Sequence, residues 1–403
     1  MAEIADFGGV VFVVGAACAA AVLAAKLTAR VPIPTPAIFL VVAAAASDAY
    51  PHLHDYLDIR DVTRVGVVAL IVILFHGGMG IGTRKFRAAL IPTLTVGVLG
   101  TFATAAAVAG FAHWALGFAW ITAGIIGAAI APTDPAVMFS VLGGREVGGR
   151  SGTILEVESG VNDPVGIALM IGMIELATHP HSSFLVVVKE FALEMSIGGA
   201  IGIAAGWALT IVINRAALPS RPLYPLLTLA CAATIYGGTS LAHGSGFLAV
   251  FVAGLIAGGA DLTAKRATER FLAALASLAE IVVFVALGLT VDLADLGNSH
   301  VGGYGLLLAV FLGFAARPAV ILPLLAPAHL RWGERLFVAW AGLKGAVPIL
   351  LAAFAVLEKV DEARRIYLLV FVVVIFSVVV QGSLVPAVAA RLGVRMVAGE
   401  SRH

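Results

Sequence analysis

The chain has 403 residues, of which 61% are hydrophobic and only 12% charged, and its mean hydropathy is +1.04. Soluble globular domains are about 45–50% apolar and about 25% charged, so this composition excludes a soluble protein and indicates a polytopic membrane protein. The basic residues are scattered over short loops, which excludes a nucleic-acid-binding patch. The two cysteines, Cys18 and Cys231, lie in apolar segments and are interpreted as buried small hydrophobes.

Apolar runs divide the whole chain. A bilayer core of about 30 Å requires roughly 17–25 apolar residues per helix. Runs of this kind, some short or interrupted, predict an all-α protein with about 13 transmembrane helices. They lie near residues 9–27, 34–48, 62–82, 88–113, 117–142, 152–177, 184–213, 222–242, 245–260, 271–291, 302–327, 335–357 and 366–389. No loop is long enough for a soluble domain, so we expect a single membrane domain over residues 1–403.

The loops alternate in charge. One set of loops carries about 17 of the 25 Lys and Arg residues, among them Arg84, Lys85 and Arg395. The opposite set carries acids such as Asp292 and Asp295. Since basic residues accumulate in cytoplasmic loops, the N-terminus is expected outside and the C-terminus in the cytoplasm, across the inner (plasma) membrane of the cell.

Two of the expected helices are interrupted, the fifth by Ala131–Pro135 and the twelfth by Gly342–Pro348. Proline removes a backbone donor and clashes with the preceding turn, so each site is expected to unwind its helix. The two sites are seven helices apart, as expected for two inverted six-helix repeats whose broken helices cross at a transporter's binding site. An alternative is a pair of ordinary proline kinks, but each break also carries a charge.

Those charges have an expected role. A broken helix leaves about +0.5 charge at each N-terminus and about −0.5 at each C-terminus inside the membrane. We expect Asp134 to offset the positive ends and Lys344 the negative ends.

The sixth helix carries the polar sequence Glu158–Pro164 at the centre of an apolar run. An aspartate at a helix centre costs about 2.5–3.5 kcal/mol even on insertion-based scales, so such residues are usually functional. An isolated carboxylate in these surroundings takes a proton, and it can also bind a cation. The cluster is therefore typical of a proton-coupled cation carrier. The alternative is that these are satisfied polar residues that join helices.

Helical spacing separates the two acids. Glu158 and Asp163 are five residues apart, which puts them roughly 140° apart around the helix, so one faces the ion and the other needs a cationic partner. Only Arg317 and Lys344 lie deep inside apolar segments. Because arginine suits a buried pair, we assign Glu158 to Arg317 and leave Asp163 to the ion. Glu280 is a further intramembrane acid, with a possible supporting role.

Together these motifs resemble the NhaP-type cation/proton antiporters, in the electroneutral branch marked by an Asn-Asp pair, here Asn162 and Asp163. The resemblance covers nearly the whole chain. It depends on Thr133-Asp134-Pro135, Glu158–Pro164, Arg317-Pro318 and Gly345–Pro348. Leu223–Leu227 and Gly244–Val250 look most like the bacterial potassium/proton members.

The resemblance implies an NhaA-like antiporter fold and a homodimer. Its moving core would include residues 88–177 and 302–389, and the remaining helices would form the dimerisation part. It also implies that the cation and the proton bind at Asp163 with Thr133, Ser159 and Asn162. Two residues depart from the family pattern. His76 stands where an acid is usual, and is interpreted as a polar residue at a helix end; Lys344 stands where arginine is usual.

The predicted function is electroneutral exchange of a monovalent cation, K⁺ favoured, for H⁺ by alternating access. A sodium/proton exchanger of the same fold is the alternative, and a cation channel is a more distant one. No enzymatic activity is expected, since neither a nucleophile–base pair nor a histidine cluster is evident in the apolar segments. No cofactor is expected beyond the transported ions.

Overall fold

The computed structural model describes residues 35–49, 58–134, 145–179, 184–298 and 300–398, with Val137 and a few residues near the N-terminus. The first expected helix, residues 9–27, lies mostly outside the described residues, as does Cys18. Cys231 is a half-buried free thiol.

Helices overlap every expected range after the first. The fold is all-α, as predicted, apart from one small sheet. In chain order the helices are α2 (Thr35–Ala49), α3 (Ile59–Ala88), α4 (Leu90–Leu94), the π-helix η2 (Thr95–Gly100), α5 (Thr101–Leu116), α6 (Trp120–Ile130), α8 (Gly149–Thr178), α9 (Phe184–Arg215), α10 (Leu223–Leu241), α11 (Gly246–Gly259), α12 (Lys265–Leu289), α13 (Ala294–Asn298), α14 (Val301–Phe311), the π-helix η3 (Leu312–Ala316), α15 (Arg317–Leu324), the 3₁₀ turn η4 (Ala326–Ala328), α16 (Trp332–Trp340), α17 (Ala346–Leu357), α18 (Ala363–Ile375), the π-helix η5 (Phe376–Gln381) and α19 (Gly382–Arg391).

Length and hydropathy make this a multi-pass membrane protein. Among the described residues, seven helices are long and apolar enough to cross a membrane, and four apolar helices are shorter. The seven are Ile59–Ala88, Leu90–Leu116, Gly149–Thr178, Val187–Arg215, Lys265–Leu289, Val301–Leu324 and Ala363–Arg391. The count of 13 helices and the inverted repeat remain predictions.

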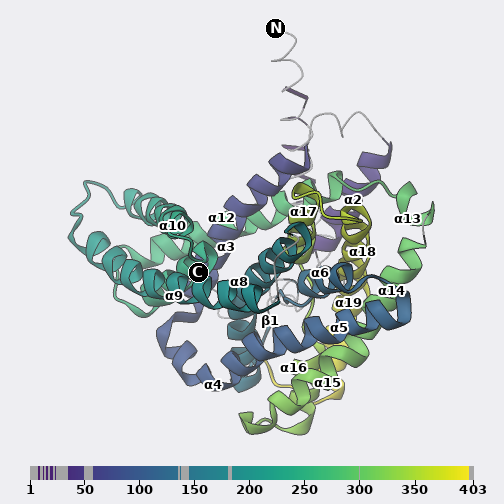
Figure 1. The fold of residues 1–403 in the computed structure, drawn as a ribbon. Helices are drawn as coiled ribbons and strands as arrows, with labels where there is room; N and C mark the ends of the chain where they lie inside the picture. The colour runs from purple at the N-terminus through teal and green to yellow at the C-terminus, as the bar shows by residue number, and fades with distance from the viewer. Residues whose placement is uncertain are drawn as a thin grey trace.

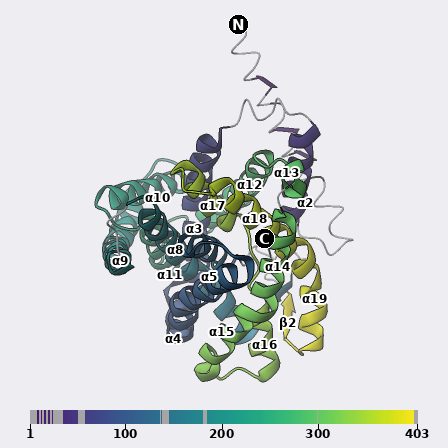
Figure 2. The same ribbon diagram turned by 45° about the vertical axis from the view of Figure 1, so that its right-hand side comes forward.

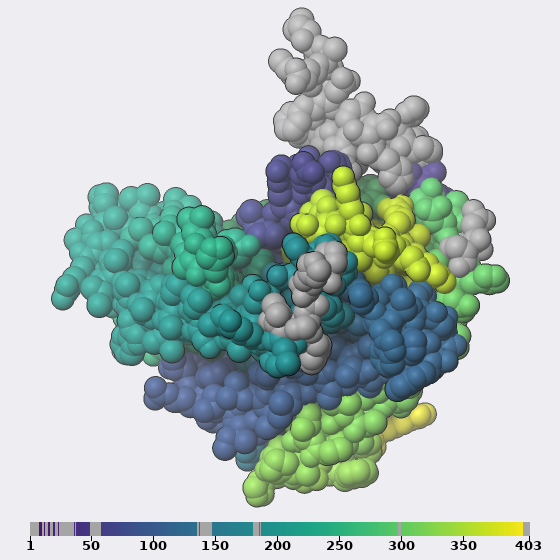
Figure 3. Space-filling view, viewed as in Figure 1, coloured from purple at the N-terminus to yellow at the C-terminus, as the bar shows by residue number. Residues whose placement is uncertain are grey.

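Buried apolar side chains form two clusters. The smaller cluster joins α9 and α10 to parts of α3, α11 and α12, and includes Phe75, Ile213, Ile235 and Val250. The larger cluster fills the space between the other helices. Figures 1 and 2 show α9 and α10 together at one side of the molecule, away from α5, α14 and α19. In the space-filling view this side forms a separate teal lobe (Figure 3).

Helices α3 and α11 approach each other closely. A Cβ added to Gly78 on α3 would overlap the carbonyl of Phe251, and one added to Gly254 on α11 would overlap the carbonyl of Phe75. Small residues at such a contact let two membrane helices pack backbone to backbone. This contact fixes α3 beside the cavity described below.

A short sheet links the loop before α8 to the end of the described chain. Strand β1 (Arg145–Val147) pairs antiparallel with β2 (Met396–Ala398). The backbone N–H of Gly148 extends the pairing by donating to the carbonyl of Arg395 at 2.8 Å. The sequence analysis did not predict these strands, because three residues are too few to give an alternating pattern.

Candidate functional site

Both predicted interruptions are real breaks between helices. α6 ends at Ile130 and residues 131–134 are not helical; α16 ends at Trp340 and α17 begins at Ala346. The N–H of Asp134 in the first break donates to the carbonyl of Leu343 in the second at 2.8 Å. The two breaks therefore touch, although about 210 residues separate them in the chain.

Lys344 closes the end of α6. Its Nζ donates to the carbonyls of Ala131 and Pro132, each at 2.8 Å, and its side chain is 1% exposed. The last carbonyls of a helix lack partners within the helix and carry its negative end charge, so a buried ammonium group satisfies both needs. This is the contact expected of Lys344.

Asp134 lies at the start of α17. Gly345 directly precedes this helix, and a Cβ there would overlap the Asp134 carboxylate. The absence of a side chain at Gly345 thus lets the carboxylate approach the positive end of α17.

On α8, the four residues Glu158, Ser159, Asn162 and Asp163 are all buried. The Nδ2 of Asn162 donates to Thr133 Oγ1 at 2.7 Å, and the Thr133 N–H donates to Asn162 Oδ1 at 3.4 Å. Both ends of the amide are therefore engaged with the first break. Ser159 Oγ lies within hydrogen-bond distance of the carbonyls of Leu155 and Glu156 on its own helix.

Glu158 pairs with Arg317, the partner that the sequence analysis assigned to it. Arg317 Nη2 donates to Glu158 Oε1 at 2.7 Å, and both side chains are at most 3% exposed. The guanidinium group lies against Gly342 in the second break, where a Cβ would overlap it. Among the described residues, Glu158 Oε2 and Arg317 Nε are buried without hydrogen-bond partners, so one hydrogen bond joins the pair.

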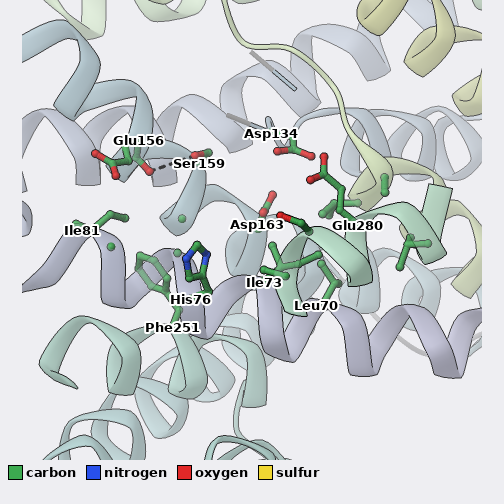
Figure 4. A pocket seen from close by; sticks show the side chains of 18 of the residues that line it. Leu70, Ile73, His76, Ile81, Asp134, Glu156, Ser159, Asp163, Phe251 and Glu280 are labelled. Carbon is green, nitrogen blue, oxygen red and sulfur yellow. Dashed lines mark hydrogen bonds between the residues drawn. The ribbon is translucent and has the colours of Figure 1, made fainter. Parts of the chain in front are cut away.

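A cavity of about 290 Å³ lies beside Asp163. Its walls come from α3, α8, α12 and α17, with Phe251 of α11 and Asp134 of the first break. The polar residues that line it are His76, Asp134, Glu156, Ser159, Asp163, Ser277 and Glu280. Figure 4 shows the carboxylates of Asp134 and Glu280 on the same side of the cavity as Asp163, and Glu156 toward the opposite side.

Two acids in this cavity have an unsatisfied oxygen. Asp163 Oδ1 and Glu280 Oε1 are buried without a hydrogen-bond partner in the described part of the chain. Buried polar atoms are nearly always satisfied, so an unpartnered carboxylate oxygen next to a cavity marks Asp163 and Glu280 as candidates for binding a proton or an ion. The predicted ligands divide into two groups. Ser159 lines the cavity with Asp163, whereas Thr133 and Asn162 contact each other and do not line it.

The interpretation of His76 as a helix-end residue is wrong. α3 continues through Gly77 and Gly78 to Ala88, with a kink at Gly82, where φ is 64°. His76 therefore lies in the middle of a helix and faces the cavity. Gly78 packs closely against α11, which lets the helix continue through the glycine pair.

Sequence reasoning missed an ion pair at the edge of the cavity. Lys85 Nζ on α3 lies 3.3 Å from Glu156 Oε2 on α8, and the two side chains are 48% and 29% exposed. Glu156 lines the cavity, so the pair joins the cavity wall to Lys85, one of the basic residues that were expected on the cytoplasmic side.

It also missed Ser377 and Gln381. Both are buried, and both hydrogen-bond to groups that border the second break. A serine and a glutamine four residues apart in an apolar run are the same signal that identified the sixth helix, so the pattern could have revealed them.

Comparison with known proteins gives the family. Residues 7–391 match the family model described as "Sodium/hydrogen exchanger, transmembrane". The chain belongs to this family. It is 33% identical over 381 residues to the K⁺/H⁺ antiporter NhaP of Alkalimonas amylolytica, covering 94% of this chain and 66% of that protein. It is 26% identical over 336 residues to the Na⁺/H⁺ antiporter ApNhaP of Aphanothece halophytica, covering 80% of this chain and 63% of that protein.

The chain spans about two thirds of the length of these relatives. Among solved structures, it is similar to the sodium proton antiporter MjNhaP1 of Methanocaldococcus jannaschii, with a TM-score of 0.82 and 22% identity. That likeness covers 97% of this chain and 99% of the other. The predicted family and antiporter fold are confirmed, and the family is one of transporters.

Proposed function

We propose that this protein is a secondary antiporter that exchanges a monovalent cation, preferably K⁺, for H⁺ by alternating access. The observation that carries the proposal is Asp163, a buried carboxylate beside a cavity, with Oδ1 unpartnered. Such a group binds a proton when no cation is present and can release it when a cation arrives. Competition of the two ions for one carboxylate is sufficient to couple their transport.

The other buried charges support a one-for-one exchange. Glu158 pairs with Arg317, Lys344 donates to the carbonyls of Ala131 and Pro132 just after α6, and Asp134 lies at the positive end of α17. Asp163 then alternates between one proton and one monovalent cation, so both loaded states carry the same net charge. Glu280 supports the cavity and keeps the same charge in both states.

The cation site we propose consists of Asp163 and Ser159, with Thr133 and Asn162 completing it. Ser159 and Asp163 share one face of α8 because they are four residues apart. Thr133 and Asn162 hold the first break against that face through their mutual hydrogen bonds. Carbonyl and hydroxyl oxygens near the break supply the neutral ligands that an alkali cation requires.

Potassium is favoured because relatives at about 33% identity are named K⁺/H⁺ antiporters, whereas the named Na⁺/H⁺ antiporter is 26% identical. Sodium/proton exchange at the same site is the alternative function. We propose no enzymatic activity and no cofactor beyond the transported ions.

The assembly follows from exposure. In the apolar stretch of α9 only 28% of residues are buried, against 44–67% in the other six long apolar helices. We propose that the lobe of α9 and α10 forms the dimerisation part of a homodimer. Residues 88–177 and 302–389 would form the moving core. The protein would lie in the cell (plasma) membrane with its N-terminus outside and its C-terminus in the cytoplasm.

Purified protein in liposomes tests this function. With an internal pH dye, addition of external K⁺ should drive proton movement, and Na⁺ should do so more weakly. Protein-free liposomes are the control. A stronger response to Na⁺ would support the alternative exchanger, and cation current at uniform pH would indicate a channel. No proton movement with either ion would refute antiport.

A further inference from the structure

A buried chain of hydrogen bonds holds the second break from the side away from the cavity. Gln381 Nε2 donates to the carbonyl of Trp340, the last residue of α16, at 2.6 Å. Ser377 Oγ donates to Gln381 Oε1 at 3.1 Å and accepts the N–H of Lys344 at 2.9 Å. Ser377 and Gln381 are 3% and 4% exposed. The chain therefore satisfies a carbonyl on one side of the break and an amide on the other.

The residue types suit these positions. Trp340 offers only a carbonyl acceptor and Lys344 only a backbone donor, so the groups between them must both donate and accept. The Gln381 carboxamide and the Ser377 hydroxyl do this together. Gln381 donates to the Trp340 carbonyl and accepts from Ser377, and Ser377 accepts from the Lys344 N–H. Each group would otherwise be a bare polar atom in an apolar interior, which is costly.

Ser377 and Gln381 lie in the π-helix η5, between α18 and α19. π-turns of this kind often occur at functional sites. Two other π-helices also lie near the place where the two helix breaks touch. η3 directly precedes Arg317, and its Gly313 faces the Gln381 amide. η2 packs at Gly97 against α8, near the carbonyl of Glu158.

The same series of hydrogen bonds continues from the second break to the proposed cation site. Lys344 is held at its N–H by Ser377, and its Nζ holds the carbonyls of Ala131 and Pro132. Thr133, the next residue, is bonded to Asn162, which precedes Asp163. Five residues on three separate parts of the chain thus link η5 to the carboxylate: Lys344, Ala131, Pro132, Thr133 and Asn162.

We propose that Gln381 and Ser377 are positioning residues for the cation site, because they set the place of Lys344 and, through it, of the first break. This role depends on the proposed antiport, and neither side chain lines the cavity. Their loss should therefore displace the site without removing any of its ligands.

Gln381→Glu is the most informative variant. A protonated carboxyl can still donate to the Trp340 carbonyl, whereas an ionised one repels it. Thermal stability of the purified full chain and exchange in liposomes should therefore both approach wild type at low pH and fall as pH rises. Gln381→Leu removes the donor and should be impaired at every pH.

Ser377→Ala leaves the Lys344 N–H without a partner and should raise the apparent KM for K⁺ about tenfold, while Ser377→Thr keeps the hydroxyl and should restore it. Ser47→Ala is the matched control. Its hydroxyl donates to the Leu289 carbonyl at 2.7 Å and so joins α2 to α12. It should lose stability without a change in KM.

The two readouts separate the two proposals. If the wild type performs no exchange, antiport fails, while the pH-dependent stability of Gln381→Glu still tests the hydrogen-bond chain. If the wild type exchanges and Gln381→Glu keeps its pH profiles, the positioning role is overturned. The role is also overturned if Ser377→Ala and Ser47→Ala change KM equally.

Discussion

The two helix breaks touch each other but are held by different partners. The first, residues 131–134, is bonded by Asn162 on α8 and by Lys344 from the other break. The second, residues 341–345, is bonded by Ser377 and lies against Arg317 at Gly342. The first break itself reaches the cavity through Asp134, whereas Ser377 and Gln381 support the second break and do not line the cavity.

This difference separates the contacts proposed to take part in ion binding from those that only support the second break. On the proposed mechanism, a change in the ion or proton bound to Asp163 would reach the first break through its neighbour Asn162, without passing through the second. The second break has no cavity-facing side chain among residues 341–345. We therefore expect substitutions at Asp163 to abolish transport and substitutions among the supporting contacts to reduce stability or rate by smaller amounts.

The largest effect is expected at the carrier residue. Asp163→Asn should abolish exchange and leave the protein folded, because an amide cannot bind a proton and a cation in turn. Exchange in liposomes and thermal unfolding in detergent measure the two outcomes. Asp61→Asn is the control, since Asp61 is an exposed acid paired with Arg64 on α3. Exchange near the wild-type rate in Asp163→Asn would remove the central role from this carboxylate.

The Glu158–Arg317 pair should have the next largest effect. Removing one partner of a buried pair leaves an uncompensated charge and costs about 3–5 kcal/mol. Glu158→Ala and Arg317→Ala should each lower the free energy of unfolding by this amount, measured by denaturant titration. The double variant should cost less than the sum of the two. Strict additivity would mean that the two side chains do not interact.

Lys344→Met should have an intermediate effect. It leaves the carbonyls of Ala131 and Pro132 without donors, at a cost of about 1.5–3 kcal/mol, and should slow exchange. Lys265 is a matched control, because its Nζ donates to the carbonyls of Gly258 and Ala260 at the end of α11. It is half-buried and does not line the cavity. Lys265→Met should leave the exchange rate unchanged. If both variants slow exchange equally, the contact of Lys344 with the first break has no special role.

The smallest effect is expected from labels that test orientation. Asp295 is half-exposed and forms a loose pair with Arg364 at 3.7 Å, so Asp295→Cys should cost little stability. In right-side-out vesicles this cysteine should react with an impermeant thiol reagent, while Arg395→Cys should react only after the membrane is opened. The opposite pattern would reverse the predicted topology.

Much of this architecture could be predicted because membrane helices need long apolar runs. Prolines near residues 132 and 348 marked both breaks, and helical spacing separated Glu158 from Asp163. The pairing with Arg317 followed because few cations lie deep in apolar runs. Each of these predictions depends on a local sequence pattern, because an unpaired charge or polar group inside the bilayer costs free energy.

What could not be predicted depends on packing between distant helices. The place of His76 at the cavity depends on how α3 packs against its neighbours, so the sequence did not show it. The contact of Thr133 with Asn162, behind the cavity wall, depends on how the first break turns. The π-helices are invisible in sequence, because one extra residue per turn does not change an apolar run.

Exchange under an imposed membrane voltage tests the account most directly. The proposal is that one carboxylate, Asp163, carries either one proton or one cation, so no net charge moves in a full cycle. Each net charge would couple to voltage by about 2.3 kcal/mol per 100 mV, which is a large signal. In liposomes with a diffusion potential set by an ion other than K⁺, the exchange rate and the final pH difference should not change. A final pH difference that shifts with voltage would mean that a second titrating group, with Glu280 the first candidate, takes part in the cycle.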